Sequence, residues 1–527
     1  MSESSPLSGR ADLAASVAYR YHVTTNHLTD TTLLDEHYAR SMDEAIRPRL
    51  HKLYPTLTPV ALPRDSVPSK VPALDAIADA TGTGSPGEHI PDLATLARLL
   101  LLTDGITRQM KRDDRVIAFR AAPCTGALYH VELYLVCGRL PGLDAGVYHY
   151  GVHDHALRRL RSGDHRATLV EAGGNEPALA HAPVILITTS VFWRNAWKYL
   201  DRAYRHTFWD TGTMLPNTLA VAAATSLPAR LVLAFADQPV ADLLGIDQDH
   251  EGVTSLVALG RSTVEPPSAP PIDLLDLPTE PYSPRELDLP LIRDAHQATL
   301  LHSGAAATTW RSVTNAVESN PTLPEALIEL PMQRTEALPP DPIEDVIRRR
   351  GSSRRFARAS ITIAQLSTLL DRTTRGMPTD SLGPEGIPFN TAYLIVNAVE
   401  GLTPGAYVYH RHRHALELLH SLPETEARTQ SSYLALEQDL GGDAAVNIYF
   451  LADLDRILTH AGDRGYRLAQ LGGALVAGKL YLASYALGLG ATGLTFFDDA
   501  VTAFFGAHAF GKSVMFLIAI GVPRRAR

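Results

Sequence analysis

Residues Gly146-Val147-Tyr148-His149-Tyr150 decide the fold, because the same pattern returns in the second half of the chain as Gly405-Ala406-Tyr407-Val408-Tyr409. Two further segments return at nearly the same spacing: His155-Ala156-Leu157 as His414-Ala415-Leu416, and Asp201-Arg202-Ala203-Tyr204-Arg205 as Asp463-Arg464-Gly465-Tyr466-Arg467. A period of half the chain is far longer than the tens of residues of a solenoid repeat. It therefore indicates a duplicated domain, and we expect one chain to form a covalent pseudo-dimer.

Each copy lacks motifs that the other copy keeps. The second copy opens with Arg350-Gly351-Ser352-Ser353-Arg354-Arg355-Phe356, and the register of the following helix places the arginine-free segment 80–86 opposite it. The first copy keeps Pro123-Cys124-Thr125-Gly126-Ala127-Leu128, which falls on 382–387 of the second. The second copy keeps Gly488-Leu489-Gly490-Ala491-Thr492-Gly493, which falls on 226–231 of the first. Each motif thus survives in one copy only.

Bulk composition indicates a soluble enzyme and excludes several other classes of protein. The 527 residues suffice for two domains with separate cores, and a formal net charge of −9 argues against a nucleic-acid binder or an anionic-membrane binder. Only two cysteines are present, Cys124 and Cys137, so we expect no disulfide framework and no cysteine-rich metal site. No signal peptide is evident, and a reducing, cytoplasmic setting is expected. The apolar stretch 468–489 contains Lys479, which predicts a helix buried between protein layers rather than a membrane span.

The expected organisation is α+β, with two tandem domains of one type. We expect a helical lead-in over residues 1–70, a first domain over 71–262, a proline-rich connector over 263–335 and a second domain over 336–527. Strands are predicted at 132–136, 184–188, 231–234, 255–259 and 514–520, and one helix is predicted in the connector near 291–307.

The three surviving motifs suggest a site for an anionic ligand. Arg350 and Arg354 bracket Ser352 and could offer charge-assisted hydrogen bonds to one phosphate, although a solvated basic turn would look the same. The glycines at 488–493 would let a ligand approach the backbone closely, although glycine commonly just ends a helix. The segment 123–128, taken alone, is a turn that leads into a strand.

Together these motifs resemble the flavin mononucleotide (FMN) site of the nitroreductase superfamily, and more closely that of the SagB/ThcOx-type dehydrogenases, which oxidise azoline rings in peptides. Segment 350–356 resembles the family's R-x-S-x-R-x-F phosphate motif, and segment 123–128 resembles its P-S-x-G-A-L turn, with Cys124 in place of serine. Tyr21-His22 resembles the opening of such chains, and Leu243-Leu244-Gly245-Ile246-Asp247 their L-L-G-x-D ending.

The resemblance implies that the two copies share one site, because family dimers build each flavin site from both subunits. The second copy would supply Arg350, Ser352, Arg354, Gly490, Ala491, Thr492 and Gly493, with Arg524 and Arg525 of the basic tail. The first copy would supply Pro123, Cys124, Thr125, Gly126 and Ala127. The mirror site would have to hold phosphate with Ala80, Gly82 and Gly84, whose side chains cannot do so.

The catalytic residues implied by the resemblance are Lys198 and Tyr199, which resemble the family's Lys-Tyr pair. Aromatising an azoline requires removal of a proton from the ring carbon next to the carbonyl, which a desolvated lysine or a tyrosine can assist. Without the resemblance, Lys198 would be a surface lysine beside two aromatics. In the second copy the register places His460-Ala461 there.

Three departures from a simple family pattern are evident. Cys124 replaces a serine, and we expect it to have no nucleophilic role. The family's glutamate after Tyr-Arg is not obvious, since Phe208-Trp209-Asp210 stand near its place. The histidines in 410–414 are interpreted as an exposed turn, and no metal is expected.

Three functions remain open at this point. The leading one is an FMN-dependent dehydrogenase acting on azoline-bearing ribosomal peptides, as in thiazole/oxazole-modified peptide or thiopeptide pathways, with the precursor peptide and a cyclodehydratase as partners. The alternatives are an oxidoreductase of this fold with another substrate, and a non-catalytic flavin scaffold in a peptide-modifying complex. The chain would act as a pseudo-dimeric monomer or a higher oligomer, and the sequence identifies neither the peptide, the ring type nor the final electron acceptor.

Overall fold

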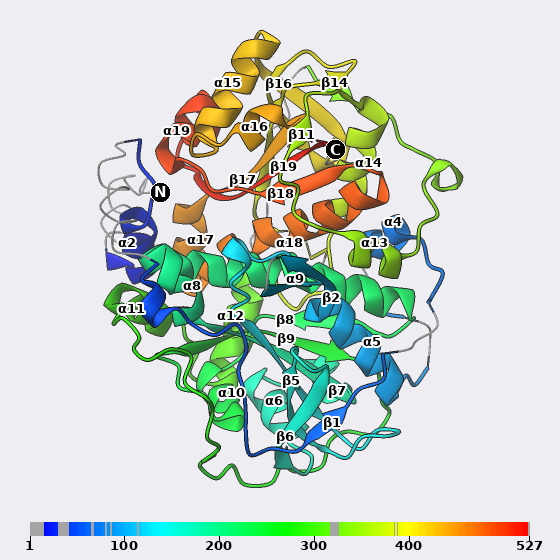
Figure 1. Cartoon of the computed structure of the whole chain (residues 1–527), viewed down its shortest axis with the longest axis vertical. Helices are drawn as coiled ribbons and strands as arrows, with labels where there is room; N and C mark the ends of the chain where they lie inside the picture. Colours follow the sequence, from blue (N-terminus) through cyan, green and yellow to red (C-terminus); the bar gives the residue numbers. More distant parts are fainter. Residues whose placement is uncertain are drawn as a thin grey trace, which may run out of the picture.

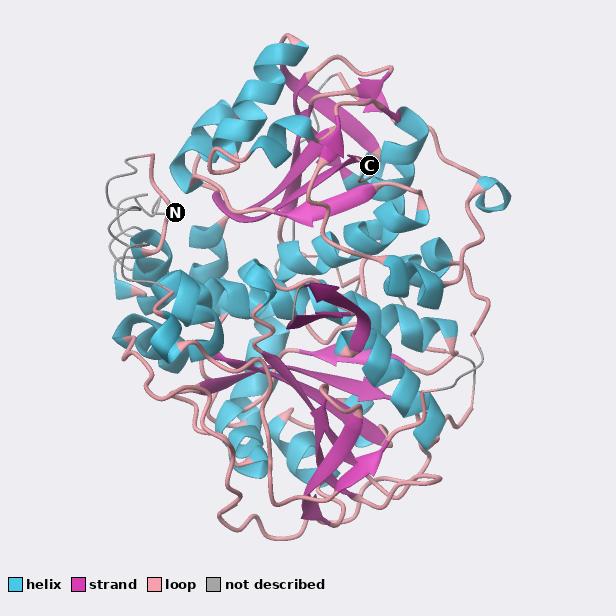
Figure 2. Ribbon diagram, viewed as in Figure 1, coloured by secondary structure: helices cyan, strands magenta, loops and turns pink. Residues whose placement is uncertain are grey.

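The computed structural model describes residues 15–29, 42–64, 68–79, 82–84, 87–112, 115–316, 326–383, 385–386 and 388–524. It confirms the predicted fold class: mixed helices and strands form two halves, each with its own sheet, and a layer of helices lies between the two sheets (Figures 1 and 2).

The sheet of the first half has the strand order β1-β6-β5-β4-β7-β9-β8, with every neighbouring pair antiparallel. Its strands are β1 (Pro59–Ala61), β4 (Val131–Cys137), β5 (Gly146–Gly151), β6 (Ala156–Ser162), β7 (Val184–Val191), β8 (Ala229–Val232) and β9 (Glu251–Leu259). The central strands β4, β7 and β9 are buried along their whole length, because helices and loops cover both faces. The strands predicted at 132–136, 184–188 and 255–259 are therefore confirmed, whereas the one predicted at 231–234 begins and ends two residues earlier, as β8.

The sheet of the second half repeats this order as β10-β16-β15-β13-β17-β19-β11, with β18 also paired to β19. Its strands are β10 (Ile328–Glu329), β11 (Phe356–Ala357), β13 (Thr391–Val396), β15 (Gly405–His410), β16 (Ala415–Ser421), β17 (Val446–Ala452), β18 (Gly490–Gly493) and β19 (Ser513–Pro523). The repeated Gly-x-Tyr-x-Tyr segments are β5 and β15, and each forms a hairpin with the next strand. Both hairpins shift register at the same place, after Val147 and after Ala406.

Two long helices, α9 (Ala203–Ala224) and α18 (Gly465–Ala486), pack against each other between the sheets (Figure 1). Glycine permits their close approach: a Cβ placed on Gly212 would lie 2.6 Å from that of Ala474, and one on Gly478 would lie 2.7 Å from the Thr213 carbonyl oxygen. The 468–489 stretch is thus a helix buried between protein layers, as predicted. Within the described residues, no helix is long and apolar enough to cross a membrane.

The two halves exchange buried ion pairs that obey the pseudo-twofold symmetry of the repeat. Asp498, the first residue of α19 (Asp498–Phe504), accepts from Arg202 at 3.0 Å and from Arg205 at 2.8 Å. Asp237, the first residue of α10 (Asp237–Leu244), accepts from Arg464 at 2.5 Å and from Arg467 at 2.8 Å. Each carboxylate of one half therefore forms ion pairs with two arginines of the other.

The symmetry extends into the connector, where α11 (Pro290–Ala298) is the counterpart of the N-terminal helix α2 (Val17–Thr24). The Arg205 Nε donates to Thr25 Oγ1 after α2, and the Arg467 Nε donates to Thr299 Oγ1 after α11, both at 2.9 Å. The Leu301 N–H then donates to Asp237, so the chain leaves the helix at this point. The single helix predicted near 291–307 is therefore wrong: Ser303 caps a separate helix, α12 (Gly304–Asn315).

The remaining elements cover the sheets and join the halves. The other helices are α4 (Ala73–Ala78), α5 (Leu93–Asp104), α6 (Arg166–Ala172), α7 (Pro177–Ala180), α8 (Phe192–Tyr199), α13 (Ile343–Arg349), α14 (Ile363–Thr373), α15 (Glu424–Leu434), α16 (Asp439–Asp443) and α17 (Leu454–Ala461). Two small sheets complete the fold: β2 (Ile106–Arg112) with β3 (Arg115–Arg120), and β12 (Ile361–Thr362) with β14 (Val399–Glu400).

Candidate functional site

Arg350 follows α13 and crosses from the second half to the first. Its Nε donates to the Ala121 carbonyl oxygen at 3.1 Å, and its Nη2 donates to the Arg120 carbonyl oxygen at 3.0 Å. The side chain is buried, which lowers the pKa of the guanidinium. No carboxylate of the described residues forms an ion pair with it, so the cation is held by neutral carbonyls two residues before the Pro123 turn.

The serines after Arg350 lie against the glycine strand β18. The Ser353 N–H donates to the Ala491 carbonyl oxygen at 2.9 Å, and a Cβ placed on Gly490 would lie 2.2 Å from Ser353 Oγ. That hydroxyl is buried without a hydrogen-bond partner in the described part of the chain. The Tyr481 hydroxyl accepts from the Gly493 N–H at 2.5 Å and lies 3.4 Å from Ser352 Oγ. The structure therefore brings the arginine motif and Gly490–Gly493 together; β18 is a strand, where sequence reasoning gave only a glycine-rich segment.

The other predicted arginines lie on the surface beside this loop. Arg354 is exposed. Arg524 is also exposed, and its N–H donates to the Arg355 carbonyl oxygen just beyond the pairing of β19 with β11. Arg525 lies outside the described residues.

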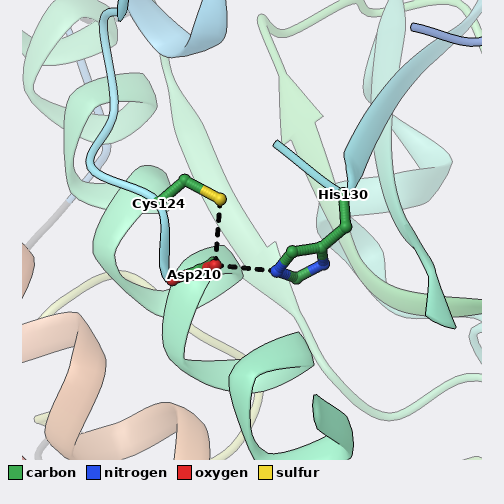
Figure 3. Close-up of side chains that lie close together, drawn as sticks. All are labelled: Cys124, His130 and Asp210. Carbon is green, nitrogen blue, oxygen red and sulfur yellow. Dashed lines mark hydrogen bonds and ion pairs between the residues drawn. The ribbon is translucent and has the colours of Figure 1, made fainter. Parts of the chain in front are cut away.

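The turn of the first half, Pro123–Ala127, is fixed by Asp210 of helix α9 (Figure 3). The Asp210 carboxylate accepts from the Thr125 N–H at 2.9 Å, from Thr125 Oγ1 at 2.8 Å and from the Cys124 thiol at 3.1 Å. His130 Nε2 lies 2.7 Å from the same carboxylate. Left-handed backbone at Gly126 (φ 64°) and Ala127 (φ 54°) makes the turn tight.

The protonation of this cluster makes Cys124 a hydrogen-bond donor. Burial, reinforced by the Asp210 charge, raises the pKa of the Cys124 thiol well above its ordinary value. Burial alone would raise the pKa of Asp210, but its hydrogen bond with His130 and the nearby histidines lower it overall. Cys124, His130 and Asp210 have ligand atoms within 4.8 Å of one another, as a metal site would, yet hydrogen bonds within the cluster account for that proximity. Sequence reasoning missed Asp210, although a carboxylate inside an apolar helix was a signal.

Lys198 and Tyr199 end helix α8 directly beside the turn. A Cβ placed on Gly126 would lie 2.9 Å from the Tyr199 hydroxyl oxygen, and the Tyr199 ring meets His206 edge to face at 4.7 Å. Lys198 Nζ lies 5.3 Å from the centre of the Tyr199 ring, and both side chains are half-buried. His460, the counterpart in the second half, is near the end of α17, where Nδ1 lies 2.8 Å from the Arg456 carbonyl oxygen.

Aromatic rings connect the two parts of the site. From Tyr199, the ring contacts continue through His206 to Trp209 at 4.9 Å and on to Phe516 at 5.6 Å. Phe516 Cζ would lie 3.3 Å from a Cβ on Gly493. A series of ring contacts therefore links Tyr199 of the first half to the glycine strand of the second.

The mirror position is filled by the chain itself. Residues 377–382 are buried beside β8: the Leu231 N–H donates to the Pro378 carbonyl oxygen at 2.8 Å, and the Asp380 N–H donates to that of Leu231 at 3.0 Å. A Cβ placed on Gly82 would lie 2.5 Å from Pro378 Cβ. Gly84 lies next to Pro228, and Ala80 falls outside the described residues.

Comparisons with known proteins agree with this geometry. A model described as the nitroreductase family matches residues 88–261 and 347–522. The solved structure of a nitroreductase-type protein from Anabaena variabilis aligns over 97% of this chain and 100% of its own, with 26% identity and a TM-score of 0.74. The alignment thus spans both halves.

Three characterised or named relatives are similar to parts of the chain. MJ1384 of Methanocaldococcus jannaschii, which carries the nitroreductase name, is 28% identical over 156 residues, or 30% of this chain and 75% of MJ1384. The trifolitoxin-processing protein TfxB of Rhizobium leguminosarum bv. trifolii is 24% identical over 266 residues, or 46% of this chain and 70% of TfxB. The microcin B17-processing protein McbC of Escherichia coli is 29% identical over 134 residues, or 24% of this chain and 49% of McbC. The family resemblance drawn from the motifs is therefore confirmed.

Proposed function

The chain belongs to the nitroreductase family and carries two of its domains in tandem, and from this premise we propose that it is an FMN-dependent dehydrogenase that oxidises thiazoline or oxazoline rings of a ribosomal precursor peptide. The observation that carries the proposal is the composite site. Arg350 of the second half donates to the Arg120 and Ala121 carbonyl oxygens just before the Pro123–Ala127 turn of the first half, while Ser353 lies against β18 and Tyr199 lies against Gly126 of that turn.

The residues present fit a flavin phosphate. Arg350 is a buried cation without a carboxylate partner among the described residues, and Ser353 Oγ is a buried hydroxyl without a hydrogen bond there. Both features are costly unless an anionic acceptor binds beside them. The phosphate would be held by Arg350, Ser352 and Ser353, with help from Arg354, Arg524 and Arg525. The flavin ring system would lie between Gly490–Gly493 and the Pro123–Ala127 turn of the first half. When bound, FMN supplies the hydride acceptor.

The role of Lys198 and Tyr199 is to take or hold the proton that leaves the ring carbon next to the carbonyl. In support, Tyr199 lies against Gly126 of the turn and its ring meets His206 edge to face, and Lys198 is its neighbour at the end of α8. Burial lowers the pKa of His206 well below its ordinary value, so this neighbour stays neutral and adds no charge that would oppose a protonated Lys198.

The names of two relatives support a peptide substrate. TfxB and McbC are named for processing trifolitoxin and microcin B17. By analogy, the partners proposed here are a precursor peptide and the cyclodehydratase that forms its azoline rings, in the cytoplasm, as in thiopeptide pathways.

The test separates flavin binding from chemistry. Lys198→Ala and Tyr199→Phe should keep the yellow colour of bound flavin but lose oxidation of an azoline peptide, measured as the loss of 2 Da per ring. The rate should fall by roughly 10²–10⁴-fold if general-base help is removed. His460→Ala is the matched control, because it occupies the equivalent place in the second half and should be nearly silent. A severe defect in His460→Ala with Lys198→Ala tolerated would refute the assignment, and a wild-type chain that binds flavin but leaves every azoline peptide unchanged would refute the substrate class.

A further inference from the structure

A second arginine lies beside Arg350, and it comes from the other half of the chain. Arg108 is in β2; burial is the main cause that lowers the pKa of Arg350, and the positive charge of Arg108 adds to that shift. A Cβ placed on Gly351 would lie 4.0 Å from Arg108 Nη2. Two guanidinium groups thus approach the same loop, and no described carboxylate pairs with either of them. Like charges gathered without a counter-charge favour an anionic ligand.

Arg108 is held in place by its own hairpin. It is the cross-strand partner of Phe119 in β3, and its guanidinium lies 4.5 Å from the centre of the Phe119 ring. Cation–π stacking of this kind orients the guanidinium while leaving its N–H donors available. The side chain is exposed, so these donors can reach a ligand at the loop surface.

The hairpin belongs only to the half that completes the site. In the first half it follows α5 and leads into the Pro123 turn. In the second half the described residues between α14 and β13 form no such hairpin, and 377–382 instead fill the mirror position. The hairpin that carries Arg108 therefore lies beside the intact arginine loop. The mirror position has no equivalent hairpin among the described residues.

We propose that Arg108 is a cross-domain ligand for the phosphate of the bound flavin nucleotide, so that this anion is held from both halves. The inference rests on the proposed function, because it requires a phosphorylated flavin at the Arg350 loop. Sequence reasoning could not find Arg108, because it lies outside every recognised motif and reaches the loop only in the folded chain.

The test measures dissociation constants of the full-length chain for FMN and for riboflavin by flavin fluorescence. Arg108→Ala should weaken FMN binding about tenfold, as loss of one charge-assisted hydrogen bond predicts. It should leave riboflavin binding unchanged, because riboflavin has no phosphate. Inorganic phosphate should compete with FMN less effectively in the variant than in the wild type. Lys111→Ala is the matched control: it removes the same charge from the same hairpin, three residues along and hence on the opposite face.

The outcomes distinguish this inference from the proposed function. If Arg350→Ala loses FMN while Arg108→Ala binds it like the wild type, Arg108 is no ligand and the flavin site stands. If Arg108→Ala weakens FMN and riboflavin equally, the effect is structural and the inference fails. If neither arginine affects FMN, the flavin site itself is misplaced.

Discussion

At the scale of single residues, Asp210 fixes more of the geometry of the site than any residue of the three motifs does. Its carboxylate joins the turn of the first half to the central helix through Thr125, Cys124 and His130. Because Asp210 is buried, removing it would leave the buried His130 and the half-buried Cys124 and Thr125 without their acceptor. The carboxylate therefore couples the shape of the Pro123–Ala127 turn to the packing of α9.

Replacing Asp210 with alanine should lower both stability and flavin content. We expect the free energy of unfolding to fall by about 3 kcal/mol, the cost of breaking a buried charged network from one side. Chemical denaturation and the absorbance of bound flavin measure the two effects. Cys124→Ser is the control, because serine can donate the same hydrogen bond to Asp210, and it should stay close to the wild type. Equal behaviour of the two variants would show that Asp210 does not hold the turn.

At the residue scale, sequence motifs indicated which neighbouring residues to assign to the site, whereas contacts that join distant segments became visible only in the fold. Lys198 and Tyr199 lie against the predicted turn, since the family pattern already couples them. Asp210 and Arg108 were missed as site residues, because neither belongs to a recognised motif and each reaches its partners only in the folded chain. Arg354 and Arg524 lie on the surface beside the loop, and their role as flavin ligands stays a prediction.

At the scale of elements, the sequence predicted the buried helix at 468–489, and the repeated Gly-x-Tyr-x-Tyr segments fold into equivalent hairpins in the two halves. The sequence did not reveal α11 as the second copy of α2. Only His296 and Thr299 retain the character of His22 and Thr25, and their shared role is to meet arginines at the interface between halves.

Lys479 shows how an element can bury a polar group that sequence alone leaves unexplained. It lies within α18, fully buried, and its Nζ donates to the Gly376 carbonyl oxygen at 2.6 Å. Burial lowers its pKa to about 8, with Asp79 opposing the shift and Arg375 adding to it. The lysine thus supports the loop that leads into the filled mirror position.

This pKa gives a pH-dependent prediction. The lowered folded pKa means that, between pH 8 and about 10.5, the unfolded chain binds a proton that the folded chain does not, so stability from this group rises with pH and is lost as pH falls through 8. The wild type should therefore gain on the order of 3 kcal/mol relative to Lys479→Met across that window. Paired urea titrations at the two pH values measure the difference. A constant difference would mean that Lys479 stays protonated in the fold.

At the scale of the whole molecule, the two halves are nearly symmetric in how they pack together, but they differ at the two positions where a ligand could bind. The exchanged ion pairs of Asp237 and Asp498 keep the twofold arrangement of a dimer. The two candidate ligand positions do not keep this symmetry. One has the buried cation Arg350 and the small-residue strand β18, while the mirror position is filled by residues 377–382. Tandem duplication lets one copy lose what the other retains, because the halves always meet.

This asymmetry predicts one flavin per chain. Pro378 lies against Gly82 and pairs with β8, so a second nucleotide would have to displace a buried, hydrogen-bonded segment, and segment 80–86, which stands opposite the arginine motif in the repeat, contains no arginine to bind its phosphate. Flavin released by denaturation, divided by chain concentration from amino-acid analysis, should give a ratio near one. Arg350→Ala should bring that ratio close to zero, because no second site would retain the cofactor. Two flavins per wild-type chain, or half of the flavin remaining in Arg350→Ala, would mean that residues 377–382 move aside and that the mirror position binds after all.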